Sequence, residues 1–154
     1  MNRVKYQVME KIITNNEKET QEVGGRLWKQ NEQYLGKQAV VFALEGELGA
    51  GKTQLVKGLA KAMGIKDDVI SPTFTLEAEY GLGKLAHIDA WRIEDSRELL
   101  EIGFEKRIMD KQVIVVEWAD QVKDVLEKVV GKIKIVWVKL SYGAKDDERI
   151  IEIK

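Results

Sequence analysis

Apolar residues along the chain follow two kinds of spacing, one typical of strands and the other of helices. Residues 39–44 and 113–116 are continuous apolar runs rich in β-branched side chains, which is the pattern of strands buried on both faces of a sheet. Residues 52–63 instead carry apolar side chains at helical spacing up to Gly64. This pattern predicts a helix that ends at that glycine.

The N-terminal part predicts a strand followed by a helix. Residues 6–13 form a modest strand candidate, and Thr14 and Glu17 stand three positions apart, as the first and last residues of a capping box do. We therefore expect Thr14 to cap a helix that runs to about Gln30. Gly24-Gly25 is expected to be its weak spot.

The remaining segments complete an alternating α/β order. They predict a hairpin of strands at 73–80 and 84–91 around Gly81-Leu82-Gly83, a helix from 95 or 96 to about 109 interrupted by Gly103, a short helix at 121–130, and two paired strands at 133–140 and 149–154. The strand at 133–140 alternates apolar with charged residues, so we expect it to be half-exposed near a sheet edge. The whole pattern predicts a single α/β domain, residues 1–154, with mixed strand directions.

Composition excludes several classes of function. The 154 residues include no cysteine, so no disulfide, thiolate nucleophile or cysteine-based zinc site can form. The formal net charge is −1 without a basic block, which gives direct, sequence-independent nucleic-acid binding no electrostatic support. No segment has the pattern of a signal peptide or a membrane span. We therefore expect a cytoplasmic protein that does not enter a membrane.

The strongest chemical signal is the segment Gly46-Glu47-Leu48-Gly49-Ala50-Gly51-Lys52-Thr53, here called the glycine loop. It has the form G-x-x-x-x-G-K-[ST] and lies between a predicted strand and a predicted helix, as in proteins that bind nucleoside triphosphates. Its backbone N–H groups can cradle phosphates, while Lys52 reaches the β- and γ-phosphates and Thr53 ligates Mg²⁺.

Two carboxylates are candidates for the other half of such a site. Glu117 ends the apolar run 113–116, and ligands of open α/β sheets gather at the carboxyl ends of strands. A carboxylate there can hold the metal directly or through water. Asp89 lies in His87-Ile88-Asp89-Ala90-Trp91, where strand alternation places Asp89, His87 and Trp91 on one face. We expect that polar face to line a wet cleft.

Three other residues fit a structural and a functional role equally well. His87 is as compatible with a hydrogen-bonded structural side chain as with catalysis, and we assign it no chemistry. Arg92 can face phosphate or simply lie at the surface. Thr73, in Ser71-Pro72-Thr73-Phe74-Thr75, can belong either to a switch segment that senses the γ-phosphate or to an ordinary turn before the hairpin.

The motifs in this order resemble the bacterial TsaE family, formerly called YjeE. The resemblance rests on G-E-L-G-A-G-K-T, S-P-T-F-T-L-x-x-E-Y, H-x-D-x-x-R, a Glu98–Phe104 segment similar to E-L-x-E-x-G-F, and the strand ending in Glu117-Trp118. The family comprises small P-loop ATPases needed for threonylcarbamoyladenosine at tRNA position 37. The resemblance implies a P-loop NTPase-like three-layer sandwich with a mixed parallel and antiparallel central sheet.

The resemblance also implies roles for individual residues. Gly49, Ala50, Gly51, Lys52, Thr53 and Gln54 would wrap the phosphates of ATP. Thr53 and Glu117 would ligate Mg²⁺, and Asp89 would act beside the metal and the attacking water. Thr73 resembles the switch threonine, Trp118 would shape the site, and Glu17 and Lys145 match nucleotide contacts loosely. The family pattern usually has threonine at 54, tyrosine at 91 and proline at 119, where this chain has Gln54, Trp91 and Ala119.

By this resemblance, the chain is expected to hydrolyse ATP for a complex of TsaD and TsaB, which would make most tRNA contacts. No arginine is an obvious catalytic finger, so slow, partner-stimulated turnover is expected. A small-molecule P-loop kinase is the alternative, although Arg92, Arg97 and Arg107 provide few residues for an arginine-rich lid. A nucleotide-sensing adaptor that does not hydrolyse ATP is a third reading. A GTPase is disfavoured because an N-K-x-D motif is lacking.

Overall fold

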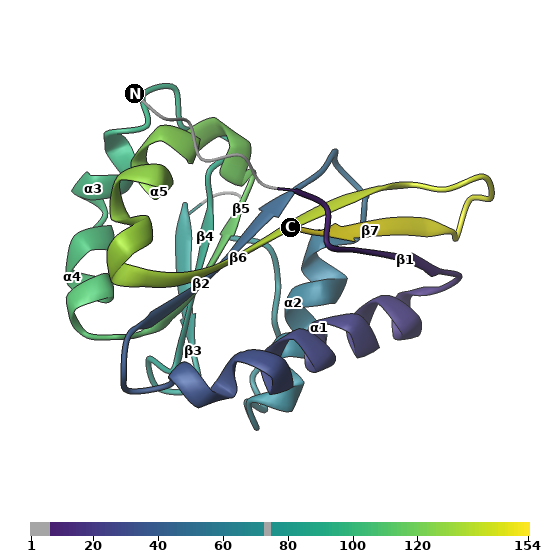
Figure 1. Ribbon diagram of the computed structural model, residues 1–154, viewed down its shortest axis with the longest axis horizontal. Helices are drawn as coiled ribbons and strands as arrows, with labels where there is room; N and C mark the ends of the chain where they lie inside the picture. The colour runs from purple at the N-terminus through teal and green to yellow at the C-terminus, as the bar shows by residue number, and fades with distance from the viewer. Residues whose placement is uncertain (1–6, 73–74) are drawn as a thin grey trace.

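Seven strands form one mixed sheet in the computed structural model, which describes residues 7–72 and 75–154. The strands are β1 (Glu10–Thr14), β2 (Ala39–Glu45), β3 (Glu77–Tyr80), β4 (Leu85–Asp89), β5 (Val113–Glu117), β6 (Ile133–Tyr142) and β7 (Arg149–Ile153). Their order across the sheet is β1-β7-β6-β2-β5-β4-β3 (Figure 1). The neighbours β4, β5, β2 and β6 run parallel, while β3 and β7 run antiparallel to the strands beside them.

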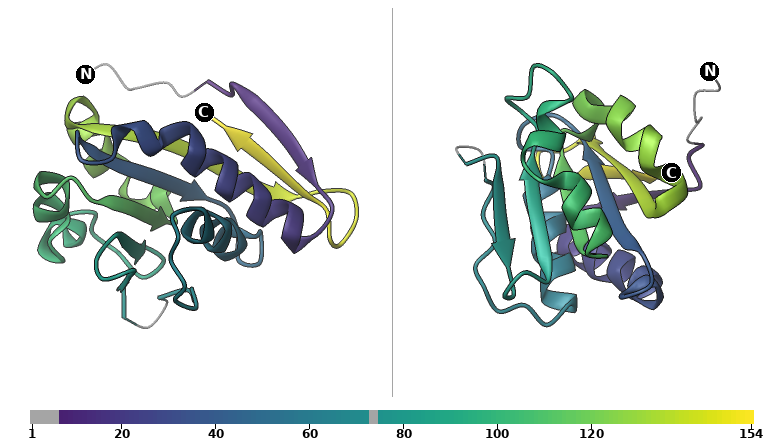
Figure 2. Two further views of the ribbon diagram at one scale, coloured as in Figure 1. Left: turned by 90° about the horizontal axis from the view of Figure 1, so that it is seen from below. Right: turned by 90° about the vertical axis from the view of Figure 1, so that its left-hand side faces the viewer.

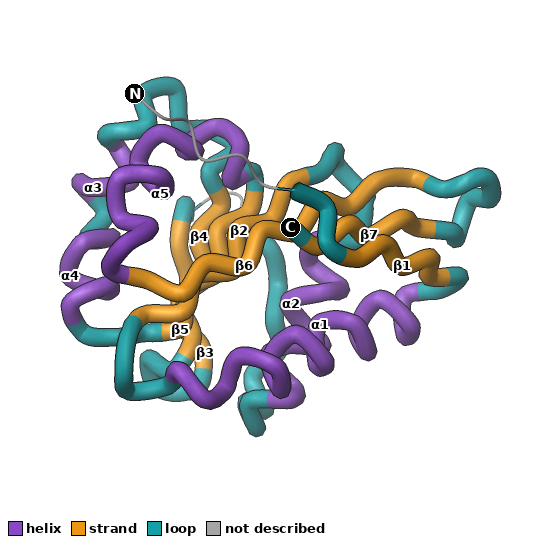
Figure 3. Tube along the Cα trace, in the orientation of Figure 1, coloured by secondary structure: helices purple, strands orange, loops and turns teal. Residues whose placement is uncertain are grey.

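Helices cover both faces of this sheet (Figure 2). On one side lie α1 (Glu17–Asn31) and α2 (Lys52–Ala62), and on the other lie α3 (Glu98–Glu101), α4 (Phe104–Met109) and α5 (Lys123–Val129). Three short 3₁₀ turns flank these helices: η1 (Glu32–Tyr34) follows α1, η2 (Ala119–Val122) precedes α5, and η3 (Val130–Lys132) follows α5. Figure 3 shows the strands between the two groups of helices. The predicted three-layer α/β class with a mixed sheet is confirmed.

The two faces of β2 belong to two separate cores. Val40, Phe42 and Leu44 pack on the side of α1 and α2, whereas Val41 and Ala43 pack on the side of α3–α5. All of these side chains are fully buried. Burial on both faces explains why this strand is an unbroken apolar run.

Helices α1 and α2 approach each other closely at two glycines, one on each helix. A Cβ atom at Gly24 would overlap the carbonyl oxygen of Leu55, and one at Gly58 would overlap that of Gln21. Helix α1 continues through Gly24 and Gly25 to Asn31, so the predicted weak spot does not interrupt it. Gly24 instead allows the close approach that places the two helix N-termini side by side.

The start of α1 also corrects a prediction. Asn16, not Thr14, caps the helix, because its side chain accepts a hydrogen bond of 2.9 Å from Glu19 N. Thr14 is the last residue of β1 and hydrogen-bonds the Thr20 hydroxyl at 2.8 Å. The chain therefore needs two further residues to turn from strand to helix.

Other elements follow the sequence with smaller differences. The predicted hairpins β3–β4 and β6–β7 are confirmed, but the helix predicted to end near Met109 is divided into α3 and α4 at Gly103, whose φ is 85°. Strand β6 lies third from its edge, because β7 and β1 continue the sheet beyond it. Among the described residues, none of the helices combines the length and apolar content that crossing a membrane requires.

Candidate functional site

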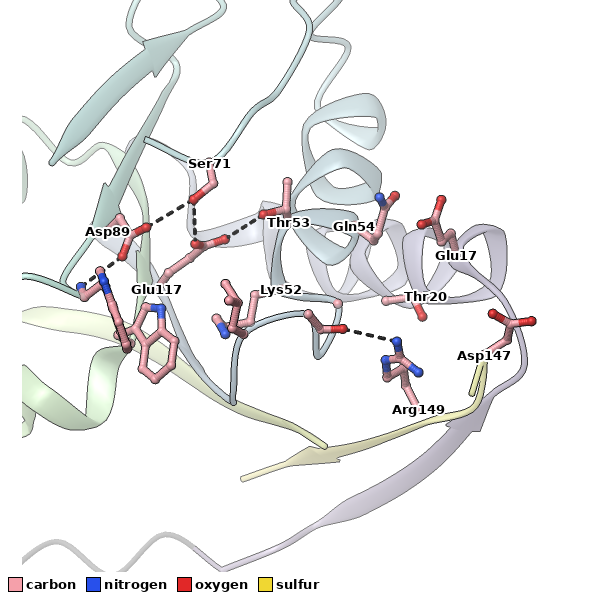
Figure 4. Close-up of a pocket in the computed structure, with 15 residues that line it drawn as sticks. Glu17, Thr20, Lys52, Thr53, Gln54, Ser71, Asp89, Glu117, Asp147 and Arg149 are labelled. Atoms are coloured by element: carbon pink, nitrogen blue, oxygen red, sulfur yellow. Dashed lines mark hydrogen bonds between the residues drawn. The ribbon is translucent and has the colours of Figure 1, made fainter. Parts of the chain in front are cut away.

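A cavity of about 480 Å³ lies at the carboxyl edge of the parallel strands. Strands β2, β4 and β5 end there in the glycine loop, Asp89 and Glu117. The lining residues are Glu17, Thr20, Leu48, Gly49, Gly51, Lys52, Thr53, Gln54, Ser71, Asp89, Trp91, Glu117, Trp118, Asp147 and Arg149 (Figure 4). Most of the residues predicted from the sequence therefore meet in one place.

The glycine loop is seated tightly on its neighbours. Gly49 and Gly51 have left-handed φ angles of 79° and 101°, which side chains rarely adopt. A Cβ atom at Gly46 would lie 2.5 Å from Leu140 O, and one at Gly49 would lie 2.5 Å from Tyr142 Oη. Glycine is thus required both for the backbone shape and for the space. Ala50 is fully buried within the loop.

Lys52 is the first residue of α2 and is largely buried. Its Nζ donates hydrogen bonds to Gly46 O and, at 2.9 Å, to Glu47 O, and it lies 4.3 Å from the centre of a Trp118 ring. Burial lowers the pKa of Lys52, against the opposing charges of Glu117 and Asp89. The amine thus lies between the loop and the carboxylates (Figure 4).

Asp89 and Glu117 lie opposite each other on the paired strands β4 and β5. Ser71 Oγ lies 3.1 Å from Asp89 Oδ2 and 3.3 Å from Glu117 Oε2, so its hydroxyl joins the two carboxylates. Thr53 Oγ1 donates to Glu117 Oε1 at 3.3 Å. Ser71 was missing from the predicted site residues, although it opens the hydroxyl-rich segment before the hairpin. Thr73 lies outside the described residues.

His87 lies beneath Glu117 rather than in a wet cleft. It is fully buried, and its Nε2 is 3.3 Å from Glu117 Oε1. The predicted polar face is therefore wrong at His87, since β4 is paired on both sides and only its end at Asp89 reaches the cavity. Burial raises the pKa of Glu117, but His87, Lys52 and Thr53 together outweigh it and hold this pKa below its ordinary value.

The aromatic pair Trp91 and Trp118 forms another part of the wall. Their ring centres lie 4.5 Å apart at a tilt of 50°. Trp118 has a left-handed φ of 57°, an uncommon conformation for a bulky residue. Placed directly after Glu117, it turns the chain from β5 into η2. Arg92 is not part of the lining.

The end of the cavity away from the carboxylates is built from three segments (Figure 4). Helix α1 contributes Glu17 and Thr20, while Gln54 of α2 accepts a 2.8 Å hydrogen bond from Gln21 of α1. The turn before β7 contributes Asp147 and Arg149. Lys145, predicted from the same turn, is not part of the described lining, and Arg149 was not predicted.

The oxygen atoms at the carboxylate end of the cavity are of the kind that bind Mg²⁺ in proteins. Magnesium prefers oxygen ligands and commonly combines one or two carboxylates with phosphates of its substrate. Glu117, Asp89, Thr53 and Ser71 present such oxygens side by side. In the described part of the chain, no group of three or more His, Cys, Asp or Glu residues could hold a metal ion. The residues fit a metal shared with a bound phosphate chain.

A family model, curated relatives and a solved structure all indicate the same protein family. The family described as "Threonylcarbamoyl adenosine biosynthesis protein TsaE" matches residues 14–150. A TsaE protein of Bacillus subtilis is 41% identical over 72% of this chain and 66% of its own length, slightly less than two thirds. One from Aquifex aeolicus is 36% identical over 76% of this chain and 82% of its own length. The crystal structure of Bacillus YdiB superimposes with a TM-score of 0.68, 28% identity and coverage of 97% and 87% of the two chains.

Proposed function

Because this chain belongs to the TsaE family of threonylcarbamoyl adenosine biosynthesis proteins, we propose that it binds and hydrolyses Mg·ATP in support of that tRNA modification. The observation that carries the proposal is the meeting of Lys52 and Thr53 with Glu117 and Asp89 in one cavity. The first pair suits phosphates, and the second suits a metal and a water molecule.

Different residues along the cavity bind the phosphates, the metal and the attacking water. Backbone N–H groups of residues 49–54 bind the phosphate chain, and Lys52 leaves its loop carbonyls to pair with the β- and γ-phosphates. Thr53 and Glu117 would hold Mg²⁺, and the metal would neutralise charge that develops on the phosphates. Asp89 orients the water that attacks the γ-phosphorus, and the bond to the β–γ bridging oxygen breaks to give ADP and phosphate. Glu17 and Lys145 would contact the nucleotide, Thr73 would respond to the γ-phosphate, and Trp118 would shape the site.

Slow turnover by the isolated chain is part of this proposal. Among the described residues, Arg149 is the arginine that lines the cavity, and its guanidinium donates to the backbone carbonyls of Asp146, Glu148 and Gly49. It lies at the end away from the carboxylates (Figure 4). A positive charge at the transition state is worth a large factor in such reactions. We therefore infer that a partner complex, TsaD with TsaB, stimulates hydrolysis and makes most of the tRNA contacts.

The alternative, a small-molecule kinase, is less well supported. An arginine-rich lid would have to come from Arg92, Arg97 and Arg107. Arg107 is engaged by Glu77 at 2.9 Å and Glu79 at 2.6 Å, and Arg97 by Asp95. Arg107 is thus held against β3, while Arg97 pairs with a carboxylate two residues before it in the chain.

The test is ATP hydrolysis by the chain alone and with the TsaD–TsaB pair. We expect slow release of phosphate alone and a clear increase with the pair. A basal rate in the range of kinases, about 1–100 per second, would contradict the proposal. Stoichiometric phosphate transfer to a metabolite would support the kinase instead. ATP binding without hydrolysis, even in a single turnover with the pair, would support an adaptor.

A further inference from the structure

Two side chains at the end of the β6–β7 hairpin contact the tip of the glycine loop. Tyr142 and Arg149 are directly opposed in the strand register. Tyr142 Oη donates to Leu48 O at 2.6 Å, and Arg149 Nη2 donates to Gly49 O at 3.1 Å. Two successive carbonyls at the tip of the loop are thus held by one cross-strand pair.

This pair is itself held in place. The Arg149 guanidinium lies 4.5 Å from the centre of the Tyr142 ring, in cation–π geometry. Its Nη1 donates to Asp146 O at 2.6 Å and Glu148 O at 2.9 Å. The hairpin turn therefore fixes the guanidinium before it contacts the loop.

The fit between hairpin and loop is close. The space where Gly49 would carry a Cβ atom is filled by Tyr142 Oη, 2.5 Å away, with Tyr142 Cζ at 3.8 Å. At Gly51 the corresponding position lies 3.9 Å from Arg149 Cγ, so the aliphatic part of this side chain packs over the loop. The carbonyl and N–H of a planar trans peptide point in opposite directions. Holding Leu48 O outward therefore sets the direction of Gly49 N–H.

We propose that Tyr142 and Arg149 are positioning residues for polyphosphate binding. They hold the backbone carbonyls of Leu48 and Gly49 at the tip of the glycine loop, so that its N–H groups are oriented before a phosphate chain arrives. Pre-orientation raises affinity because the loop then loses less freedom on binding. The inference rests on the proposed function of the loop in binding nucleotide phosphates, and it assigns that part of the affinity to a hairpin about 100 residues further along the chain.

The first test measures affinity by calorimetry for two probes, Mg·ATP and Mg·tripolyphosphate. Tyr142→Phe removes one hydrogen bond and should weaken both about five-fold, and Arg149→Met should weaken both about ten-fold because a charged donor is lost. The matched control is Tyr34→Phe, at a tyrosine of η1 beyond the C-terminal end of α1, and it should bind as the wild type does.

Equal losses for both probes are the specific expectation, because Tyr142 and Arg149 act on the phosphate part. Unchanged affinity in both variants would overturn the inference. A loss for ATP alone would also overturn it, since that result would mean direct contact with the nucleoside. If the wild-type protein binds neither probe, the proposed function fails instead.

The second test uses the space beside Gly49. Gly49→Ala places a methyl group 2.5 Å from Tyr142 Oη, whereas in Gly49→Ala/Tyr142→Phe the nearest atom of that ring is 3.8 Å away. The left-handed backbone strain is the same in both. The double variant should therefore bind tripolyphosphate more tightly than Gly49→Ala alone. A double variant that binds no better than the single one would refute the contact.

Discussion

Replacing Gly24 by alanine tests the contact that places α1 against the nucleotide cavity. The new methyl group would overlap Leu55 O and lie 3.0 Å from both Leu55 C and Leu59 N. All three atoms are backbone of α2, so no side chain can rotate away. Restoring only the 3.0 Å contacts to an ordinary 3.4 Å needs about 0.4 Å of separation between the helices, and the overlap needs more.

The magnitude follows from two opposing effects. Overpacking a tight contact costs about 1–3 kcal/mol, and a rigid backbone neighbour places Gly24 at the upper end. Alanine regains about 1 kcal/mol through its higher helix propensity. The net loss in free energy of unfolding is therefore about 2 kcal/mol, or a fall of about 4–8 °C in Tm for a domain of this size.

Thermal and urea unfolding followed by circular dichroism measure this change, and Gly25→Ala is the matched control. A Cβ atom at Gly25 would have its nearest neighbours at 3.6 Å, so the same substitution one residue later should stabilise by up to about 1 kcal/mol. Gly24→Ala should also weaken ATP binding, because Glu17 and Thr20 move with α1. If Gly24→Ala is as stable as Gly25→Ala, the close packing of the helices is refuted.

Three further predictions concern the charged residues. Lys52→Ala should weaken ATP binding about 10- to 100-fold through loss of charged hydrogen bonds, and an unchanged Kd by calorimetry would contradict its role. Glu117→Gln should bind ATP with an affinity that depends less on Mg²⁺ than that of the wild type; a Mg²⁺ dependence equal to that of the wild type would exclude Glu117 as a ligand. The lowered pKa of Glu117, from its ordinary 4.5, means that the unfolded chain binds more protons near that pH. The ionised carboxylate of Glu117 therefore stabilises the fold above about pH 4.5, and this contribution is lost as the pH falls towards the folded-state pKa. Between pH 6 and pH 4, the urea midpoint should fall less in Glu117→Gln than in the wild type. Equal falls in the two proteins would refute this.

The parts of the fold that could be predicted from the sequence are those fixed by local pattern. The apolar runs of β2 and β5 are buried on both faces, so their chemistry alone identifies them. Helix α2 follows a loop whose motif is continuous in the chain. Asp89 and Glu117 could be placed together because the carboxyl ends of parallel strands share one edge.

The features that could not be predicted depend on the register between paired strands and on how far each side chain lies from the end of its strand. Arg149 and Tyr142 reach the glycine loop only because β7 pairs with β6 in one register. His87 shares a face with Asp89, but alternation does not tell how far each lies from the end of the strand. Thr14 and Asn16 are both good capping residues two positions apart, and the length of β1 decides between them.

The most direct test of a hydrolytic role is phosphate release from Mg·ATP by the chain with the TsaD–TsaB pair, comparing the wild type with Glu117→Gln. We expect slow turnover by the wild type alone, a marked increase with the pair, and loss of that increase in Glu117→Gln while ADP binding persists. Equal stimulated turnover in the wild type and Glu117→Gln would contradict the central claim that the glycine loop and these carboxylates form one hydrolytic site.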